Sequence, residues 1–216
     1  MNRLEWILGI LLVALLLIVV GISALLWLQP RATAVPEGYV QVTTAAGVAP
    51  TSVYPGATAR VGYAAAQRGV ADWYADAVLL DAVATWPQGV SETELRAGTA
   101  NWGYTFYSPT AGAVTLVTVI GATPKRVSES PYTPPATIMD AGAWLLDSQQ
   151  AVNIFLDGGG AAFLQDNGIT TLIMQLAASN RTERMEWLVS LFADESGRSY
   201  TMRIDATSGE ILEVIE

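Results

Sequence analysis

The sequence contains no cysteine and no histidine among its 216 residues. Without cysteine it forms no disulfide and offers no thiolate nucleophile, and the absence of both residue types excludes the usual kind of zinc site. The absence of histidine removes the side chain that most often acts as a general base near neutral pH. These absences, together with the lack of a calcium-loop or phosphate-loop motif, predict a protein that is not an enzyme and that binds no metal or cofactor.

Positive charge is also scarce in this chain. There are 11 Lys and Arg residues against 20 Asp and Glu residues, which gives a formal net charge of -9 at pH 7. An acidic surface repels phosphate groups, so we expect no binding to nucleic acid. The length is sufficient for one or two domains with hydrophobic cores of their own, and without disulfides their stability has to come from packing.

One long hydrophobic run is present near the N-terminus. The stretch from Trp6 to Leu28 contains no charged residue. As a helix it would be about 34 Å long, enough to cross a hydrocarbon core of about 30 Å. Trp6 and Trp27 stand at its two ends, where indole rings prefer the membrane interface. We therefore expect residues 1–30 to form a short cytoplasmic start and a single transmembrane helix, with the rest of the chain outside the cytoplasm.

A cleaved signal peptide is the alternative interpretation of this segment. Ala32-Thr33-Ala34 has the small-x-small form of a cleavage site, and a cleaved protein would be secreted. Against cleavage, the apolar run is longer than the hydrophobic region of about 7 to 15 residues that is usual in signal peptides. Pro36 also lies close to the proposed scissile bond. A retained membrane anchor is therefore the favoured interpretation.

The chain beyond the apolar run shows the periodicities of short helices and strands. Residues 31–56 are rich in Pro, Ala and Thr and are typical of a linker. In the first half we predict a helix at 57–74, strands at 76–86, 102–107 and 114–120, and a polar loop at 87–99. In the second half we predict a helix from a capping box at Asp147–Gln150 that extends to about residue 164 or breaks at the glycines 158–160, and strands at 169–178, 185–192, 200–205 and 211–214. The proline-rich stretch 125–136 predicts a connector between the halves.

The two halves share this order of elements. A shift of 85 residues (187 − 102) places Trp187 on Trp102 and brings the turns into register. We interpret the match as an internal repeat with units at 57–130 and 131–216, each combining a helix with an antiparallel sheet. The predicted fold class is α+β. The pattern leaves open whether the two units share one sheet or pack separately.

The last residues of the chain carry a resemblance to a known family. The segment from Asp147 to Glu216, which includes YTMRIDATSGEILEV, resembles a PepSY domain, whose final strand reads roughly v.vDa.tGe.l. The residues that fit this pattern are Ile204, Asp205, Ala206, Thr207, Gly209, Glu210 and Leu212. The corresponding stretch of the first half, residues 120–124, lacks the Asp and the turn Gly. The resemblance implies a cystatin-like α+β fold, an extracytoplasmic setting in bacteria and a non-catalytic role, often the regulation of peptidases or of cell-surface assembly.

Two groups of residues are candidates for a site. Asp205, Thr207 and Gly209 are expected to shape a turn, in which the Asp side chain accepts hydrogen bonds from the backbone ahead of it and the Gly takes a positive φ angle. The alternative for these three residues is contact with a partner. Trp102 and Trp187 either fill the core, as aromatic residues on strands usually do, or form an aromatic patch for a ligand.

These features together predict a non-catalytic, membrane-anchored binding or regulatory module outside the cytoplasm. Its expected partner is an extracytoplasmic protein or peptide of unknown identity, bound at a sheet edge or in a groove between the units, and its expected task is to modulate a peptidase or an envelope protein. Two alternatives stay open at this point. One is a carboxylate-dependent hydrolase of the cell envelope, which would need a convergent pair of acids in a cleft. The other is a scaffold subunit of a membrane complex.

Overall fold

A computed structural model of the protein describes residues 56–132, 138, 140–168, 170–179 and 184–216. The predicted membrane span, Trp6–Leu28, and nearly all of the predicted linker, residues 31–56, lie outside the described residues, so both stay predictions. None of the helices within the described ranges is long and apolar enough to cross a membrane. All described residues belong to one compact unit, Val53–Glu216.

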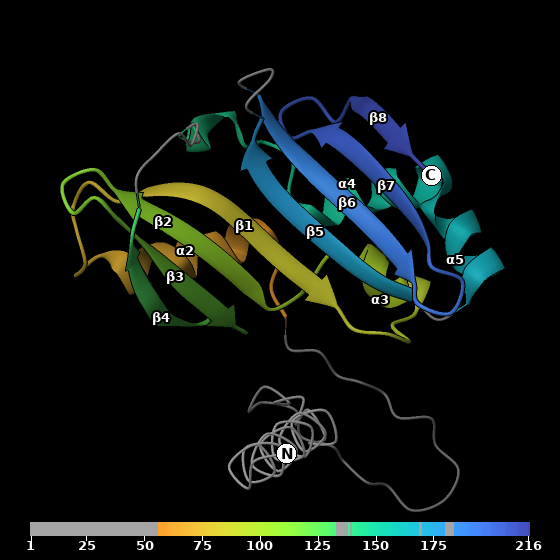
Figure 1. Ribbon diagram of the computed structural model, residues 1–216, viewed down its shortest axis with the longest axis horizontal. Helices are drawn as coiled ribbons and strands as arrows, with labels where there is room; N and C mark the ends of the chain where they lie inside the picture. Colours follow the sequence, from red (N-terminus) through yellow and green to blue (C-terminus); the bar gives the residue numbers. More distant parts are fainter. Residues whose placement is uncertain (1–55, 133–137, 139, 169, 180–183) are drawn as a thin grey trace, which may run out of the picture. The chain divides into compact units, whose positions relative to one another are not determined.

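The centre of this unit is an antiparallel sheet of eight strands (Figure 1). Its order is β4-β3-β2-β1-β5-β6-β7-β8, so each half of the chain forms a four-stranded meander and β1 pairs with β5 in the middle. The strands are β1 (Val78–Trp86), β2 (Trp102–Ser108), β3 (Ala113–Ile120), β4 (Thr123–Pro131), β5 (Thr170–Ala178), β6 (Met185–Ala193), β7 (Arg198–Asp205) and β8 (Ile211–Ile215). The predicted α+β class with antiparallel strands is confirmed, and the two halves share one sheet.

The helices cover one face of the sheet (Figure 1). They are α2 (Ala59–Val70), α3 (Glu92–Arg96), α4 (Ser148–Phe155) and α5 (Ala161–Asn167), with a 3₁₀ turn at Ala141–Ala143 and a π-helical turn at Leu156–Gly160. On β3 and β5, buried residues alternate with half-buried ones, which is the pattern of a sheet with one face on the core. The opposite face carries no helix among the described residues, and we call it the open face.

Trp102 and Trp187 lie in the centre of the core, where the two halves meet. They are 1% and 0% exposed, and their ring centroids are 5.9 Å apart in an edge-to-face arrangement. The indole N–H of Trp102 donates to the carbonyl of Ala57 (2.8 Å), and that of Trp187 donates to the carbonyl of Leu146 (2.9 Å). Of the two interpretations of these tryptophans, the core position is the one that the structure shows, because neither ring reaches the surface.

A buried serine joins the halves next to the tryptophans. Ser148 Oγ, at the start of α4, accepts a hydrogen bond from Ala59 N at the start of α2 (2.9 Å) and donates one to the carbonyl of Gly98 (2.7 Å). Gly98 has a φ of 61°, and a Cβ there would lie 2.3 Å from Gln149 Cα. Glycine is therefore required at position 98, because it lets the loop before β2 approach the start of α4.

Two stretches that were predicted as loops contain regular structure. The predicted connector 125–136 begins inside β4, which continues to Pro131. That strand tolerates its prolines because it lies at the edge of the sheet, where some N–H groups need no partner strand. The predicted loop 87–99 contains α3, which is stabilised by a capping box between Ser91 and Glu94.

The glycine run 158–160 joins two helices. The helix starts at Asp147 with the predicted capping box to Gln150. The glycines then form the π-helical turn between α4 and α5, with Gly159 at a φ of 128°. A Cβ at Gly159 would lie 2.5 Å from the Tyr200 hydroxyl oxygen. The absence of a side chain there therefore allows β7 to pack closely against this turn.

Candidate binding surfaces

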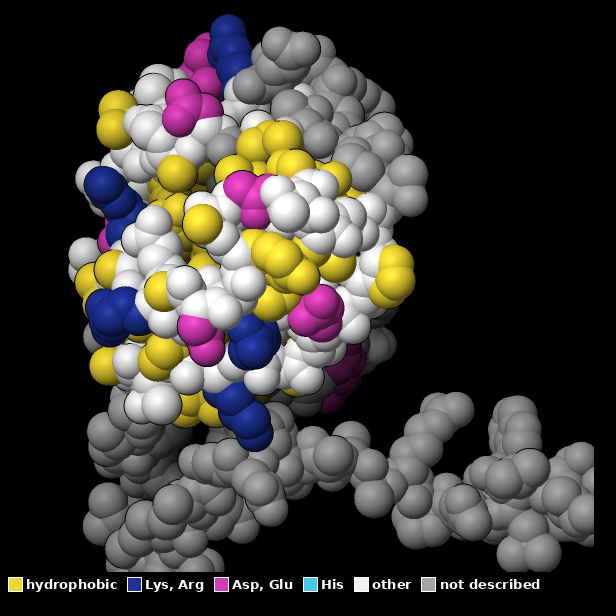
Figure 2. Space-filling view, turned by 90° about the vertical axis from the view of Figure 1, so that its left-hand side faces the viewer, with side chains coloured by type: hydrophobic (Ala, Val, Ile, Leu, Met, Phe, Trp, Pro, Cys, Tyr) yellow, Lys and Arg dark blue, Asp and Glu magenta, His cyan; other side chains and the backbone are white. Residues whose placement is uncertain are grey.

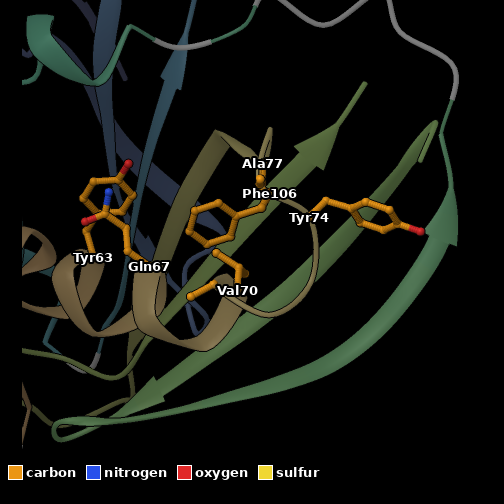
Figure 3. Close-up of a pocket in the computed structure, with 8 residues that line it drawn as sticks. Tyr63, Gln67, Val70, Tyr74, Ala77 and Phe106 are labelled. Carbon is orange, nitrogen blue, oxygen red and sulfur yellow. The ribbon is translucent and has the colours of Figure 1, made fainter. Parts of the chain in front are cut away.

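A small pocket lies between α2 and the sheet (Figure 3). Its labelled lining residues are Tyr63, Gln67 and Val70 from α2, Phe106 from β2, and Tyr74 and Ala77 from the α2–β1 connection. The volume is about 240 Å³, below the range of about 300 to 1,000 Å³ that is usual for small-molecule sites. In Figure 3 the Tyr74 ring points away from Phe106, so the two aromatic rings do not close over the pocket.

The pocket is chemically neutral. Burial raises the pKa of the Tyr63 hydroxyl, while a hydrogen bond with Gln67 acts in the opposite direction. The Tyr63 ring stacks on Phe106 with centroids 6.2 Å apart and planes at 12°, which fixes its orientation. The residues that line the pocket include no carboxylate and no amine. The pocket therefore offers no acid–base pair for hydrolysis.

Asp81 is a partly buried carboxylate outside this pocket, on the open face. Burial raises its pKa, and hydrogen bonds with Thr105 lower it again in part. Its register neighbours are Thr105 on β2 and Ala177 on β5, so no second carboxylate stands directly opposite it. Among the described residues, no group of three or more Asp or Glu side chains is arranged to hold a metal ion. Asp81 is therefore a partly buried carboxylate with a threonine and an alanine as its direct cross-strand neighbours.

The open face exposes several large apolar side chains. Val83, Leu188 and Phe192 are 36%, 37% and 39% exposed, although their immediate neighbours along each strand are buried on the helix side. Apolar groups also reach the surface on another side of the molecule, where Figure 2 shows them between scattered Lys, Arg, Asp and Glu side chains. The surface therefore carries apolar and charged side chains side by side. The open face differs from the other sides of the molecule chiefly because no helix covers it.

The two edge strands of the sheet have opposite character. β4 (TPKRVSESP) contains prolines at two positions and charged residues at three, and such residues protect an edge from pairing with another chain. β8 (ILEVI) contains no proline and a single charged residue. Its apolar residues Ile211, Val214 and Ile215 are 44%, 46% and 47% exposed. We call β8 the unprotected edge because it lacks the prolines and all but one of the charges found on β4, although it is short and has a register shift in its pairing with β7.

Ion pairs hold β8 to the sheet. Arg203 on β7 contacts Glu186 on β6 and Glu213 on β8, with N–O distances of 2.6 Å for each pair. The hydrogen bonds to Glu186 and Glu213 raise the pKa of the Arg203 guanidinium, so it stays charged. The cluster fixes the position of β8 without covering its outer side.

The turn between β7 and β8 contains the three candidate residues near the end of the chain. Asp205 Oδ1 accepts hydrogen bonds from the backbone N–H groups of Thr207 (2.8 Å) and Ser208 (2.9 Å). Thr207 Oγ1 donates to the carbonyl of Ala143 (2.6 Å). Gly209 has a φ of 80°, which a residue with a Cβ rarely adopts. The side chains of Asp205 and Thr207 therefore form hydrogen bonds within the chain itself.

The electrostatics of Asp205 follow from this turn. Its burial, with 6% of the residue exposed, would by itself raise the carboxyl pKa. The hydrogen bonds from Ser208 and Thr207, together with the guanidinium of Arg184 at 3.5 Å, bring the pKa of Asp205 below its ordinary value. Asp205 is thus an ionised group that stabilises the fold, with little surface left for a partner.

Comparisons with known proteins identify neither a family nor a function for the chain. No protein-family model matches the chain, and no curated protein matches it. Among solved structures, the chain is similar to a protein from Clostridium difficile 630 that is described as a candidate lipoprotein, with 16% sequence identity and a TM-score of 0.43. The match covers 71% of this chain and 91% of that chain. A similarity this low carries no conclusion about function, and the PepSY resemblance and the internal repeat stay predictions.

Proposed function

We propose that the chain is a non-catalytic binding module, held at the membrane by the segment Trp6–Leu28, that recognises an extended protein or peptide segment outside the cytoplasm. The observation that carries the proposal is the contrast between the protected edge β4 and the unprotected edge β8. An exposed sheet edge binds extended segments through main-chain hydrogen bonds, and alternate side chains supply specificity. The membrane segment and the position outside the cytoplasm rest on the sequence alone.

The resemblance of residues 147–216 to PepSY domains supports the same proposal, because it implies a non-catalytic role. In this interpretation the chain consists of two PepSY-like units. Each half of the described unit begins with helical structure and contributes four antiparallel strands, although the first half also has α3 between β1 and β2. The turn with Asp205 and Gly209 belongs to the second half, which is therefore the half closer to the family pattern.

A carboxylate-dependent hydrolase has less support. The described pocket is lined by neutral groups, and Asp81, whose pKa is raised, lies on the open face beside Thr105 and Ala177. A catalytic pair would need two carboxylates that converge on one site.

The proposal is tested by purifying the full chain from its own membranes in mild detergent and identifying the proteins that remain bound. Wild type is compared with V83E/L188E on the open face, with I215K on β8, and with V61E as the matched control, because Val61 is 60% exposed on α2. We expect a defined partner with wild type and V61E that is lost with at least one surface variant. The proposal is wrong if no partner is retained, or if the purified chain hydrolyses peptides or glycans and D81N abolishes that activity.

A further inference from the structure

We infer that the outer side of β8 receives the partner as an added strand, and that the partner is an extended segment in which apolar residues alternate with Lys or Arg. The inference rests on the proposed function and assigns it a place in the fold and a chemistry. Four properties of β8 support the inference: its outer backbone has no strand partner among the described residues, it differs from β4, its side chains are largely apolar, and acidic residues lie in and beside it.

The backbone of β8 is paired on one side. Residues Thr201, Met202 and Arg203 of β7 face Ile215, Val214 and Glu213 of β8. β8 is the last strand in the sheet order, and no other strand among the described residues pairs with it. The N–H and C=O groups on the outer side of an edge strand are available to another extended chain.

The opposite edge strand, β4, carries residues that hinder pairing with another chain. β4 carries prolines near both ends and the charged residues Lys125, Arg126 and Glu129. Trp73 Nε1 also donates to Glu129 Oε2 (2.9 Å), which links β4 to the α2–β1 connection. Because a single edge lacks these features, one added strand is expected for each molecule, and not a chain of molecules joined through both edges.

The side chains of β8 offer apolar contact on both faces of the sheet. Val214 faces the buried Met202 and therefore lies on the helix side, whereas Ile215 faces Thr201 on the open face. An added strand would cover both, because cross-strand neighbours on each face of a sheet lie within contact distance. Apolar residues of the partner would therefore contact Val214 on the helix side or Ile215 on the open face.

The charge around β8 selects the partner. Glu210, Glu213 and Glu216 are all exposed in and beside the strand, in a chain with a net charge of -9. Of these three, Glu213 is paired with Arg203 on β7. Antiparallel pairing of two β8 strands about their middle would place Glu213 opposite Glu213 and Glu210 opposite Glu216, and like charges in such positions destabilise a sheet. A segment with Lys or Arg would instead place opposite charges across the new pairing. A basic extended segment therefore fits this edge better than a second copy of the chain.

The experiment uses a fluorescent peptide of alternating Val and Lys, long enough to span β8, and the purified full chain in mild detergent. Two control peptides are matched to it: one with every second backbone amide methylated, which keeps the charge and removes the pairing, and one with Glu in place of Lys. Fluorescence anisotropy gives the affinities, and hydrogen exchange with mass spectrometry locates the protected amides. The variants are I215K and the matched control V127K, because Val127 is an exposed Val on the other edge strand, β4.

We expect the Val–Lys peptide to bind and to slow exchange in β8 but not in β4, and both control peptides to bind at least about tenfold more weakly. We expect I215K to weaken binding by about tenfold and V127K to leave it unchanged. The inference is overturned if the methylated peptide binds equally well, if nothing binds, or if protection appears elsewhere. It is also overturned if the chain alone forms a dimer with β8 protected.

The failure of this inference can be told apart from the failure of the proposed function. If I215K still retains the native partner from membranes and V83E/L188E loses it, the chain is a binding module that uses the open face. If wild type retains no native partner at all, the proposed function fails as well.

Discussion

Replacing Trp187 with Ala tests whether the two halves of the sheet form a single core. The side chain is fully buried, and its ring centroid lies 5.9 Å from that of Trp102 and 6.1 Å from that of Trp144. Truncating a buried Trp to Ala usually costs about 3 to 5 kcal/mol, through lost burial and the cavity that remains. We expect W187A to lower the free energy of unfolding by an amount in this range.

The milder change W187F separates packing from hydrogen bonding. It keeps an aromatic ring and removes the donor to the Leu146 carbonyl, and such a hydrogen bond contributes about 1 kcal/mol net. The carbonyl keeps a second donor, because Trp144 Nε1 also donates to it at 2.9 Å. The full penalty of a buried unpaired carbonyl is therefore avoided, and we expect W187F to cost about 1 to 2 kcal/mol including the lost volume.

The assay is urea unfolding of the full chain in mild detergent, combined with native-state hydrogen exchange. A shared core predicts that W187A speeds exchange in β2 and in β6 to the same degree, although the mutation lies in β6. The control V61A, at a residue that is 60% exposed, should change stability by less than about 0.5 kcal/mol. Faster exchange confined to β5–β8, with β2 unchanged, would refute the single core.

Three further predictions concern polar groups. D205N should destabilise the protein by about 1 kcal/mol at pH 7. Because folding lowers the pKa of Asp205, the stability that its ionised form contributes is lost as the pH falls from about 4 through the folded pKa. Urea titrations should therefore show that the difference in stability between D205N and wild type shrinks over this pH range. Asp81 has a raised pKa, so its charged form costs stability. D81N should therefore be more stable than wild type at pH 7, with the gain fading as pH falls through the folded pKa toward about 4 in the same titrations. S148A, which removes two buried hydrogen bonds, should cost about 1 to 3 kcal/mol in thermal or urea unfolding. The control S196A removes only long, exposed hydrogen bonds of 3.3 and 3.4 Å and should change stability by less than about 0.5 kcal/mol.

Much of the secondary structure follows from local signals in the sequence. Period-two patterns and apolar, β-rich runs predict β1, β2, β3, β5, β6 and β7 to within a few residues. The start of α4 follows from the capping box at Asp147, and the close of β7 follows from the Asp205 turn. These elements are predictable because a few neighbouring residues determine each of them.

The arrangement of the elements could not be predicted in the same way. The prolines and charges of β4 are also typical of a connector, and only the sheet order shows that they belong to an edge strand. The pocket was missed because Tyr63 and Phe106 are brought together by packing across α2 and β2. The unprotected character of β8 likewise depends on its place at the end of the sheet, which the apolar residues of the segment Ile211 to Ile215 do not encode.

Site-specific photo-crosslinking in the native membrane tests the binding role of β8 most directly. A photoreactive residue is placed at Ile215 on β8 and, in separate chains, at Val127 on β4 and Val83 on the open face, all of which are more than a third exposed. The account predicts a covalent adduct from position 215 with a partner segment rich in Lys or Arg, and none from position 127. Adducts at 127 or only at 83, or an adduct at 215 with a second copy of the chain, would contradict it.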